Sequence, residues 1–332
     1  MNKIWLAVFA LSVLLLSACS PIGSKNPMGD GFAGGDNGLK VSLTAGAPPP
    51  VIQDEALTPF SFVVNLENLG EAPVGPGTEN PLIIVRLLGV VLKDFGMTSE
   101  SATQRVNLPL EHARKNIDGT ITPGEITAVT FDNLAYKPNV FDSLAMTFRT
   151  EVCYDYSSEA TVKFCMKKDF IESSQDSSIC MLKGPREVGN SGAPIHVVSV
   201  DEAPVNADTV QLNFKIAHAG KGVFFARSNL ASDYDGCVMD ERNPDLYKME
   251  VEITPSQTNS YSFDCIHLDE KLTNGGAKGV VRAPLGAPLS LTCFVKRTVP
   301  IDTRVYEDLL SVKIRYRYGE FLEVPILVQG HP

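Results

Sequence analysis

The sequence contains a single tryptophan, Trp5, and lacks several patterns that would assign a chemistry. Neither a CxxC pair nor a close Cys/His cluster occurs, which argues against a structural zinc site. No glycine-rich phosphate loop follows a strand and opens a helix. Acidic residues outnumber basic ones, 39 to 29, and the formal net charge is −10, so nucleic acid is not expected as a partner. The most apolar run after the N-terminus, Leu82–Leu92, has 11 residues and contains Arg86, so it predicts a buried strand and not a membrane span.

The N-terminus carries an export signal. One positive charge, Lys3, precedes the apolar run from Ile4 to Leu16, which is too short for a membrane span but fits a signal peptide. The end of the run, Leu16-Ser17-Ala18-Cys19, resembles the lipobox of prokaryotic lipoproteins. This resemblance implies removal of residues 1–18 and attachment of diacylglycerol to Cys19, which would anchor the protein stably in a membrane. The alternative is ordinary cleavage near Ala18, with Cys19 left as a free thiol.

Residues 19–38 are predicted to form a flexible tether. The segment SPIGSKNPMGDGFAGGDNG, from Ser20 to Gly38, is rich in Gly, Ser, Pro and Asn and has hardly any apolar residue. Such a segment buries too little surface to offset the entropy lost on ordering. We therefore expect it to hold a folded part away from the membrane.

The rest of the chain has the periodicity of strands. Phe60, Phe62, Val64 and Leu66 alternate with less apolar residues, and the same alternation recurs from Val210 to Ile216. Further strand candidates are 40–43, 125–131, 144–154, 247–253, 261–265 and 289–295. Only 108–116, LPLEHARKN, has a weak helical pattern. The pattern predicts an all-β protein built of β-sandwiches.

An internal repeat divides the chain into two modules. Phe60, Phe62, Val64, Leu66 and Gly70 match Val210, Leu212, Phe214, Ile216 and Gly220 at a constant offset of 150. Near the end of each half, Val152, Tyr154, Tyr156, Val162 and Phe164 match Ile314, Tyr316, Tyr318, Val324 and Ile326 at an offset of 162. We predict one sandwich over 39–188, a linker over 189–193 and a second sandwich over 194–330. Strand, turn and strand are expected at the end of each half.

These segments resemble a known class of domain. The entry LKVSLTAGAPPPVIQDEALTPF followed by FSFVVNLENLGEAPV resembles CARDB-like and related immunoglobulin-like domains of bacterial and archaeal surface proteins. EVCYDYSSEATVKFC, GAPIHVVSV and VQLNFKIAHAGKGVFF are similar to exported archaeal proteins with tandem sandwiches. In the second copy His218 replaces the usual Asn. The resemblance implies an envelope-exposed interaction or scaffold role and supplies no catalytic residue.

The stretch GNSGAP, from Gly189 to Pro194, is similar to the nucleophile loop GDSGGP of chymotrypsin-like serine proteases. Such a serine needs a histidine base oriented by a carboxylate. Only His112 precedes Ser191, in the unrelated context LEHARKN, and Asn190 and Ala193 depart from the motif. We therefore interpret 189–193 as the flexible joint between two modules, with Pro194 opening an edge strand.

Six cysteines follow Cys19, and an even number in an exported chain predicts disulfides. They are Cys153, Cys165, Cys180, Cys237, Cys265 and Cys293. If 157–160 forms a hairpin turn, Cys153 faces Cys165; the alternative pairs Cys165 with Cys180. Cys265 and Cys293 lie on predicted strands. With three cysteines in each half, one on each side is left over, so a bridge between modules such as Cys180–Cys237 and two free thiols both remain open.

Two further sets of residues are candidates for binding. Asp233, Asp235 and Asp240, with Glu241, could supply oxygen ligands to calcium, although the spacing matches only a fragment of an EF-hand and a solvated acidic loop is the alternative. Tyr154 and Tyr156, like Tyr316 and Tyr318, share a face of their strand. They could stack on a sugar or a partner protein, or pack in the core.

The sequence as a whole favours a non-enzymatic, lipid-anchored envelope protein that binds or scaffolds a protein partner at the cell surface, with no cofactor. The alternatives are an exported hydrolase, or a calcium-dependent binding protein that uses the loop from Asp233 to Glu241.

Overall fold

The computed structural model describes residues 31–168, 179–227, 237–239, 241–283, 287–299 and 305–331. Over these residues the fold is all-β, as predicted, with one short 3-10 helix, η1 (Leu92–Phe95). The segment 108–116 is not helical: it is extended and its end forms β6 (Arg114–Lys115). Within the described residues no helix is long and apolar enough to cross a membrane. The predicted signal peptide and Cys19 lie outside the described residues.

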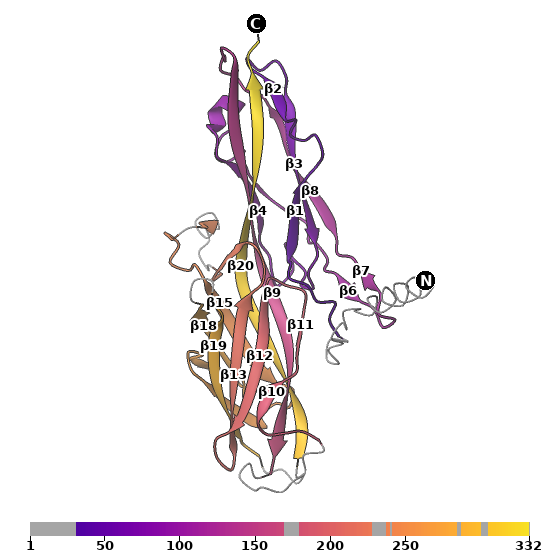
Figure 1. The fold of residues 1–332 in the computed structure, drawn as a ribbon, viewed down its shortest axis with the longest axis vertical. Helices are drawn as coiled ribbons and strands as arrows, with labels where there is room; N and C mark the ends of the chain where they lie inside the picture. Colours follow the sequence, from indigo (N-terminus) through magenta and orange to yellow (C-terminus); the bar gives the residue numbers. More distant parts are fainter. Residues whose placement is uncertain are drawn as a thin grey trace, which may run out of the picture.

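The molecule is elongated and is built around two strands of 25 residues each, β9 (Ser143–Lys167) and β20 (Val305–Gln329). They pair antiparallel without a break, from Ser143 opposite Gln329 to Lys167 opposite Val305. Figure 1 shows them running along the long axis through both halves of the molecule. The predicted hairpin turn at 157–160 is therefore wrong, because β9 continues straight through these residues.

A central sheet extends to both sides of this pair in the order β17-β18-β15-β20-β9-β4-β5, while β11 pairs with β9, and β14 and β2 pair with β20. The bounds are β2 (Val51–Gln53), β4 (Ile83–Leu88), β5 (Thr103–Arg105), β11 (Val188–Asn190), β14 (Val223–Phe225), β15 (Lys248–Pro255), β17 (Glu270–Lys271) and β18 (Ala277–Arg282).

Three smaller sheets complete the fold. One has the order β1-β3-β8, with β1 (Leu39–Leu43), β3 (Phe60–Asn68) and β8 (Ile126–Leu134). Another has the order β10-β12-β13-β19-β16, with β10 (Gly184–Arg186), β12 (Ile195–Pro204), β13 (Thr209–His218), β16 (Tyr261–Cys265) and β19 (Leu289–Arg297). A separate two-stranded hairpin consists of β6 and β7 (Ile121–Thr122).

Two sandwiches result, and they share the long strands. In the first sandwich, β1-β3-β8 packs on one half of the central sheet, as the contact between the Phe62 and Phe148 rings (5.5 Å) shows. In the second sandwich, the five-stranded sheet packs on the other half, where Phe164 meets Tyr261 at 5.4 Å. Alternate residues of β3 and β13 are buried, as their period of two predicts. The two sandwiches correspond to the upper and lower halves of Figure 1.

The internal repeat has a structural basis. β3 and β13 are equivalent strands, each pairing with an earlier strand (β1 or β12) and with a later strand (β8 or β19). β9 and β20 are also equivalent, with β4 and β15 as their respective outer neighbours. In the pair β9–β20, Asp155 lies opposite Arg317, its counterpart 162 residues later. The two copies are therefore related by an approximate twofold axis between these residues.

The predicted module boundaries need correction. The first sandwich includes the end of β20, from Tyr318, and the second includes the end of β9, from Tyr156, so the division at 189–193 is wrong. Each long strand starts in one sandwich and ends in the other. This is possible because β9 and β20 pair with each other along their whole length without a shift in register. The second sandwich is thus inserted between parts of the first.

Candidate functional site

The level at which the sandwiches meet, which we call the waist, is centred on Asp155 and Arg317. Arg317 Nε lies 2.9 Å from Asp155 Oδ1, and the two side chains are only 3% and 6% exposed. A charge buried to this degree is stable only when it is paired. Sequence reasoning missed this pair, although the offset of 162 relates the two positions.

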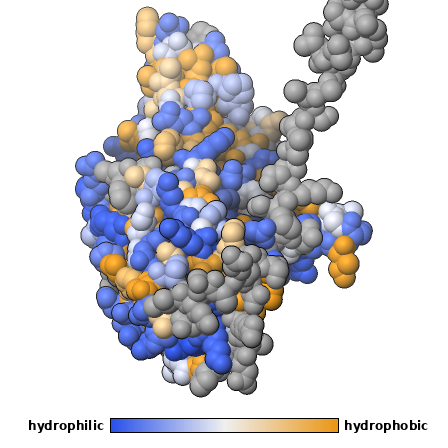
Figure 2. All heavy atoms as spheres, turned by 60° about the horizontal axis from the view of Figure 1, so that its bottom comes forward, coloured by the Kyte–Doolittle hydropathy of each residue, from blue (hydrophilic) through white to orange (hydrophobic). Residues whose placement is uncertain are grey.

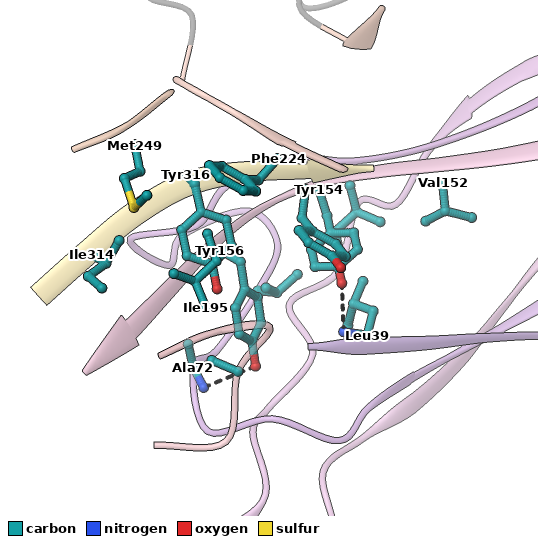
Figure 3. Close-up of a cluster of buried hydrophobic side chains, with 14 of the residues drawn as sticks. Leu39, Ala72, Val152, Tyr154, Tyr156, Ile195, Phe224, Met249, Ile314 and Tyr316 are labelled. Atoms are coloured by element: carbon teal, nitrogen blue, oxygen red, sulfur yellow. Dashed lines mark hydrogen bonds between the residues drawn. The ribbon is translucent and has the colours of Figure 1, made fainter. Parts of the chain in front are cut away.

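The residues on either side of this pair in the two strands are four tyrosines, Tyr154, Tyr156, Tyr316 and Tyr318. Their side chains lie on the opposite face of the sheet from the ion pair, and all are fully buried. Tyr154 OH accepts a hydrogen bond from Leu39 N (3.1 Å), and Tyr156 OH accepts one from Ala72 N (3.3 Å), as Figure 3 shows. Tyr316 OH lies 2.8 Å from Ser158 Oγ, and Tyr318 OH accepts from Gly222 N at 2.7 Å. Burial raises the pKa of Tyr154 and of Tyr316 well above the ordinary value. They are core residues, so the interpretation of these tyrosines as an exposed binding surface is wrong.

Two equivalent glycines pack against these hydroxyl groups. A Cβ atom on Gly70 would overlap Tyr156 OH, and a Cβ atom on Gly220 would overlap Tyr318 OH. The repeated turns after β3 and β13 therefore serve to bring the backbone close to a buried tyrosine. The glycines matched in sequence because both turns meet this constraint.

The GNSGAP stretch is bound at the waist and is not an exposed joint. Ser191 is 5% exposed. Its N–H donates to Glu159 O (2.8 Å), and its Oγ accepts from Glu159 N (2.9 Å). Asn190 exchanges two side-chain hydrogen bonds with the backbone of Val197. The prediction of a flexible linker is wrong because this segment forms β11 and its continuation, which satisfy polar groups of β9.

The end of the predicted tether is also fixed. The Glu71 carboxylate accepts hydrogen bonds from three backbone N–H groups: Ala33 (2.8 Å), Gly34 (3.0 Å) and Gly192 (2.6 Å). Gly38 O accepts from Leu69 N (3.0 Å) and Gly70 N (3.2 Å). The described part of the tether therefore enters the fold at the waist, where the sequence predicted a free chain up to residue 38.

A cavity of about 490 Å³ opens at the waist beside this entry point. Its lining includes Phe32, Glu71, Glu79, His112, Glu159 and Ser191. Lys313 Nζ bridges two of the carboxylates, lying 2.6 Å from Glu79 and 3.2 Å from Glu159. Burial opposes ionisation of Glu79, but hydrogen bonds from Lys313 and Ser157 outweigh it, so the pKa of Glu79 is lowered. The cavity wall thus carries fixed charges of both signs and suits a polar ligand.

Ser191 and His112 both line this cavity, but each forms a hydrogen bond with the backbone and not with the other. His112 Nδ1 lies 2.8 Å from the carbonyl oxygen of Ala113. Ser191 Oγ is held by the backbone of Glu159. The hydroxyl and the imidazole therefore lack the mutual hydrogen bond that activates a serine nucleophile.

The disulfide Cys153–Cys237 fastens the outer face of the waist. Around it, side chains from both halves form a second small core: Leu82, Ile84, Phe225 and Leu246. Arg86 Nη2 donates to Cys237 O (2.9 Å) and pairs with Glu151 at 2.8 Å. The disulfide joins Cys153, in the part of β9 that belongs to the first sandwich, to Cys237, which follows β14 of the second sandwich in the chain. It therefore links the two halves.

The other disulfides are Cys165–Cys180 and Cys265–Cys293. Cys165–Cys180 is the second of the two local pairings that the sequence left open, and the pairing Cys153–Cys165 is wrong because both residues lie on the continuous strand β9. A bridge between halves does exist, but it uses Cys153 and not Cys180. No cysteine among these six is left unpaired.

The calcium candidates Asp233, Asp235 and Asp240 lie outside the described residues, and Glu241 is exposed. Within the part of the chain that the structure describes, no group of three or more His, Cys, Asp and Glu side chains could hold a metal ion.

The chain matches no protein-family model and no curated protein sequence.

Proposed function

We propose that the protein is a non-enzymatic envelope lipoprotein, anchored through diacylglycerol on Cys19, that binds or scaffolds a protein partner at the cell surface. The observation that carries the proposal is the construction of the waist. Two continuous 25-residue strands, a buried ion pair and a disulfide all pass through the place where a two-module protein would normally bend. Such a body suits a rigid spacer or platform.

The location is supported by chemistry. Three disulfides are typical of proteins that fold in an oxidising compartment outside the cytoplasm. The lipobox-like end of the signal peptide supplies the anchor. We assign the sandwiches to the immunoglobulin-like, CARDB-like class on the entry strand and the strand that ends in Asn-Leu-Gly at residues 68–70.

Intact-mass spectrometry of the membrane-extracted protein tests the anchor and the disulfides together. We expect the mass of a chain that starts at Cys19 and carries diacylglycerol, with six further cysteines alkylated only after reduction. A Cys19→Ser variant should leave the membrane fraction. An unlipidated mass with freely reactive thiols would overturn the proposal.

The partner can be sought by photo-crosslinking in intact cells that produce the tethered protein, followed by mass spectrometry of the adducts. A single protein captured by the wild type and by the soluble Cys19→Ser variant alike supports a binding role. Adducts that vary randomly between preparations would argue against a specific partner.

A hydrolase is the second candidate, because Ser191 and His112 line the same cavity. Hydrolysis of ester or peptide substrates that is lost in Ser191→Ala and retained in Ser199→Ala would establish it. Absence of hydrolysis in the wild type leaves the binding role.

A further inference from the structure

The hairpin β6–β7 stands apart from the rest of the fold. Among the described strands it pairs with no other, and a lone hairpin of this kind has little stability of its own in water. Ile117 at its tip is 110% exposed, and Ile121 on its second strand is 57% exposed. Figure 1 shows the hairpin projecting sideways at the waist, and Figure 2 shows apolar atoms at the end of the projection on the right.

The tip of the hairpin is held rigid by its own polar groups. Asn116 N donates to Thr120 O (2.8 Å), and Gly119 N donates to Asn116 O (2.9 Å). The Asp118 carboxylate accepts from the backbone N–H of Thr120 at 2.9 Å and from its hydroxyl at 2.6 Å. Gly119 has a φ of +83°, which this tight turn requires. The polar groups of the turn thus hydrogen-bond to one another. The side chain of Ile117 is the exposed apolar group at the tip.

The root of the hairpin and the N-terminal chain attach to the same turn. Ala113 N donates to Gly70 O (2.9 Å), and Gly70 N donates to Gly38 O (3.2 Å). A Cβ atom on Gly124 would overlap Asn68 O, so the return strand also packs closely on the end of β3. Hairpin and chain entry are therefore fixed next to each other.

We propose that the β6–β7 hairpin inserts Ile117 into the interfacial region of the lipid bilayer that carries the anchor. The inference rests on the proposed function, since it needs the lipid on Cys19. Gly31, the first described residue, lies 12 residues after Cys19 and lines the waist cavity together with Arg114 and Lys115 of the hairpin. Twelve extended residues span at most about 40 Å.

The geometry favours a bilayer over a protein as the occupant. The lipid on Cys19 and a connection of at most about 40 Å keep the side of the molecule that bears the hairpin within reach of the membrane, whereas a protein partner would have to enter the space between them. A bilayer also removes the exposed Ile117 side chain from water without requiring complementary polar groups. With the hairpin inserted, the anchored molecule would lie with its long axis along the membrane surface.

A tryptophan reporter tests the proposal, because Trp5 is the only tryptophan of the chain. In a Trp5→Phe background, Ile117→Trp places the sole indole at the hairpin tip. Phe141→Trp is the matched control: Phe141 is similarly exposed, at 104%, but lies at the far end of the first sandwich, in the segment that packs on Gly330 near the C-terminus. Both lipidated proteins are reconstituted into phosphatidylcholine vesicles with brominated acyl chains.

We expect the Ile117→Trp protein to show a blue-shifted emission and at least a twofold loss of fluorescence in brominated compared with unbrominated vesicles. The Phe141→Trp protein should show neither change. Equal melting temperatures of the two variants and the wild type establish that the fold is intact.

Two outcomes would overturn the inference, and they are distinguishable. If the proteins float with the vesicles but the indole at position 117 is not quenched, the anchor stands and the hairpin does not insert. If the proteins fail to float, the anchor itself fails, and the proposed function falls with the inference.

Discussion

At the scale of single residues, the waist contains titratable groups that are wholly or partly removed from water and hydrogen-bond to one another. Glu320 on β20 is an example: Tyr154 OH lies 3.5 Å from its Oε1. Burial raises the pKa of Glu320 to about 6, above the model-peptide value of 4.5. Because the folded state holds this proton more tightly than the unfolded state, Glu320 lowers stability as the pH rises from about 4.5 to about 6.

We therefore predict that Glu320→Gln raises the free energy of unfolding at pH 8 by about 1 to 2 kcal/mol and leaves it nearly unchanged at pH 4. Urea denaturation across this pH range measures the effect. Glu323→Gln, at an exposed position of the same strand, is the control and should change little. Parallel pH profiles of the Glu320→Gln protein and the wild type would contradict the prediction.

A second prediction concerns the stability of variants at the two turn glycines, Gly70 and Gly220. Gly70→Ala should destabilise the protein by about 1 to 3 kcal/mol, because the added Cβ overlaps the hydroxyl of Tyr156 in a packed core. Gly220→Ala should have a similar effect through Tyr318. Gly31→Ala, with no atom within 4 Å of the new Cβ, should be neutral. Thermal melts of the three variants compare them directly, and a neutral Gly70→Ala would disprove the close contact.

At the scale of elements, β9 and β20 continue through a polar segment that resembles a turn in sequence. The residues Ser157, Ser158 and Glu159 stay in the strand because each has a partner at the waist: Ser157 Oγ donates to Glu79, Ser158 Oγ lies beside Tyr316 OH, and Glu159 pairs with Lys313. Those partners come from distant parts of the chain. The local sequence cannot show them.

The ion pair Asp155–Arg317 joins the two strands at their midpoint. Arg317→Met should cost about 3 to 5 kcal/mol, because it leaves a buried carboxylate without its partner. The double variant Asp155→Leu/Arg317→Met should recover most of this loss. Glu67→Gln, which breaks the exposed pair with Lys40, should cost at most about 1 kcal/mol. Urea denaturation of the variants measures these differences in the free energy of unfolding. An Arg317→Met protein as stable as the Glu67→Gln protein would contradict a stabilising role for the buried ion pair.

At the scale of the whole molecule, the two sandwiches form one elongated body. A 25-residue strand at about 3.3 Å per residue spans about 80 Å, so small-angle scattering should give a maximum dimension of at least about 80 Å. Removing the waist disulfide with Cys153→Ser/Cys237→Ser should leave this length unchanged, because β9 and β20 carry it.

The same double variant should lower the free energy of unfolding by about 2 to 4 kcal/mol. The loss should exceed that of Cys165→Ser/Cys180→Ser, because the waist bridge closes a separation of 84 residues and the other one of 15. Denaturation of both variants under identical conditions tests the order. A shortened or bimodal scattering profile would show that the waist bends without the disulfide.

The sequence alone determined the all-β class, the alternation of buried and exposed residues in β3 and β13, and the repeat, because these depend on local periodicity and on turn residues such as Gly70. It also determined that the six cysteines could pair completely. The tertiary structure decided which cysteines pair and that the four tyrosines lie in the core. It also decided that Ser191 hydrogen-bonds to the backbone of Glu159 on β9. Those outcomes depend on how strand edges far apart in the chain align, and the register of 25 residue pairs between β9 and β20 is the interaction that fixes them.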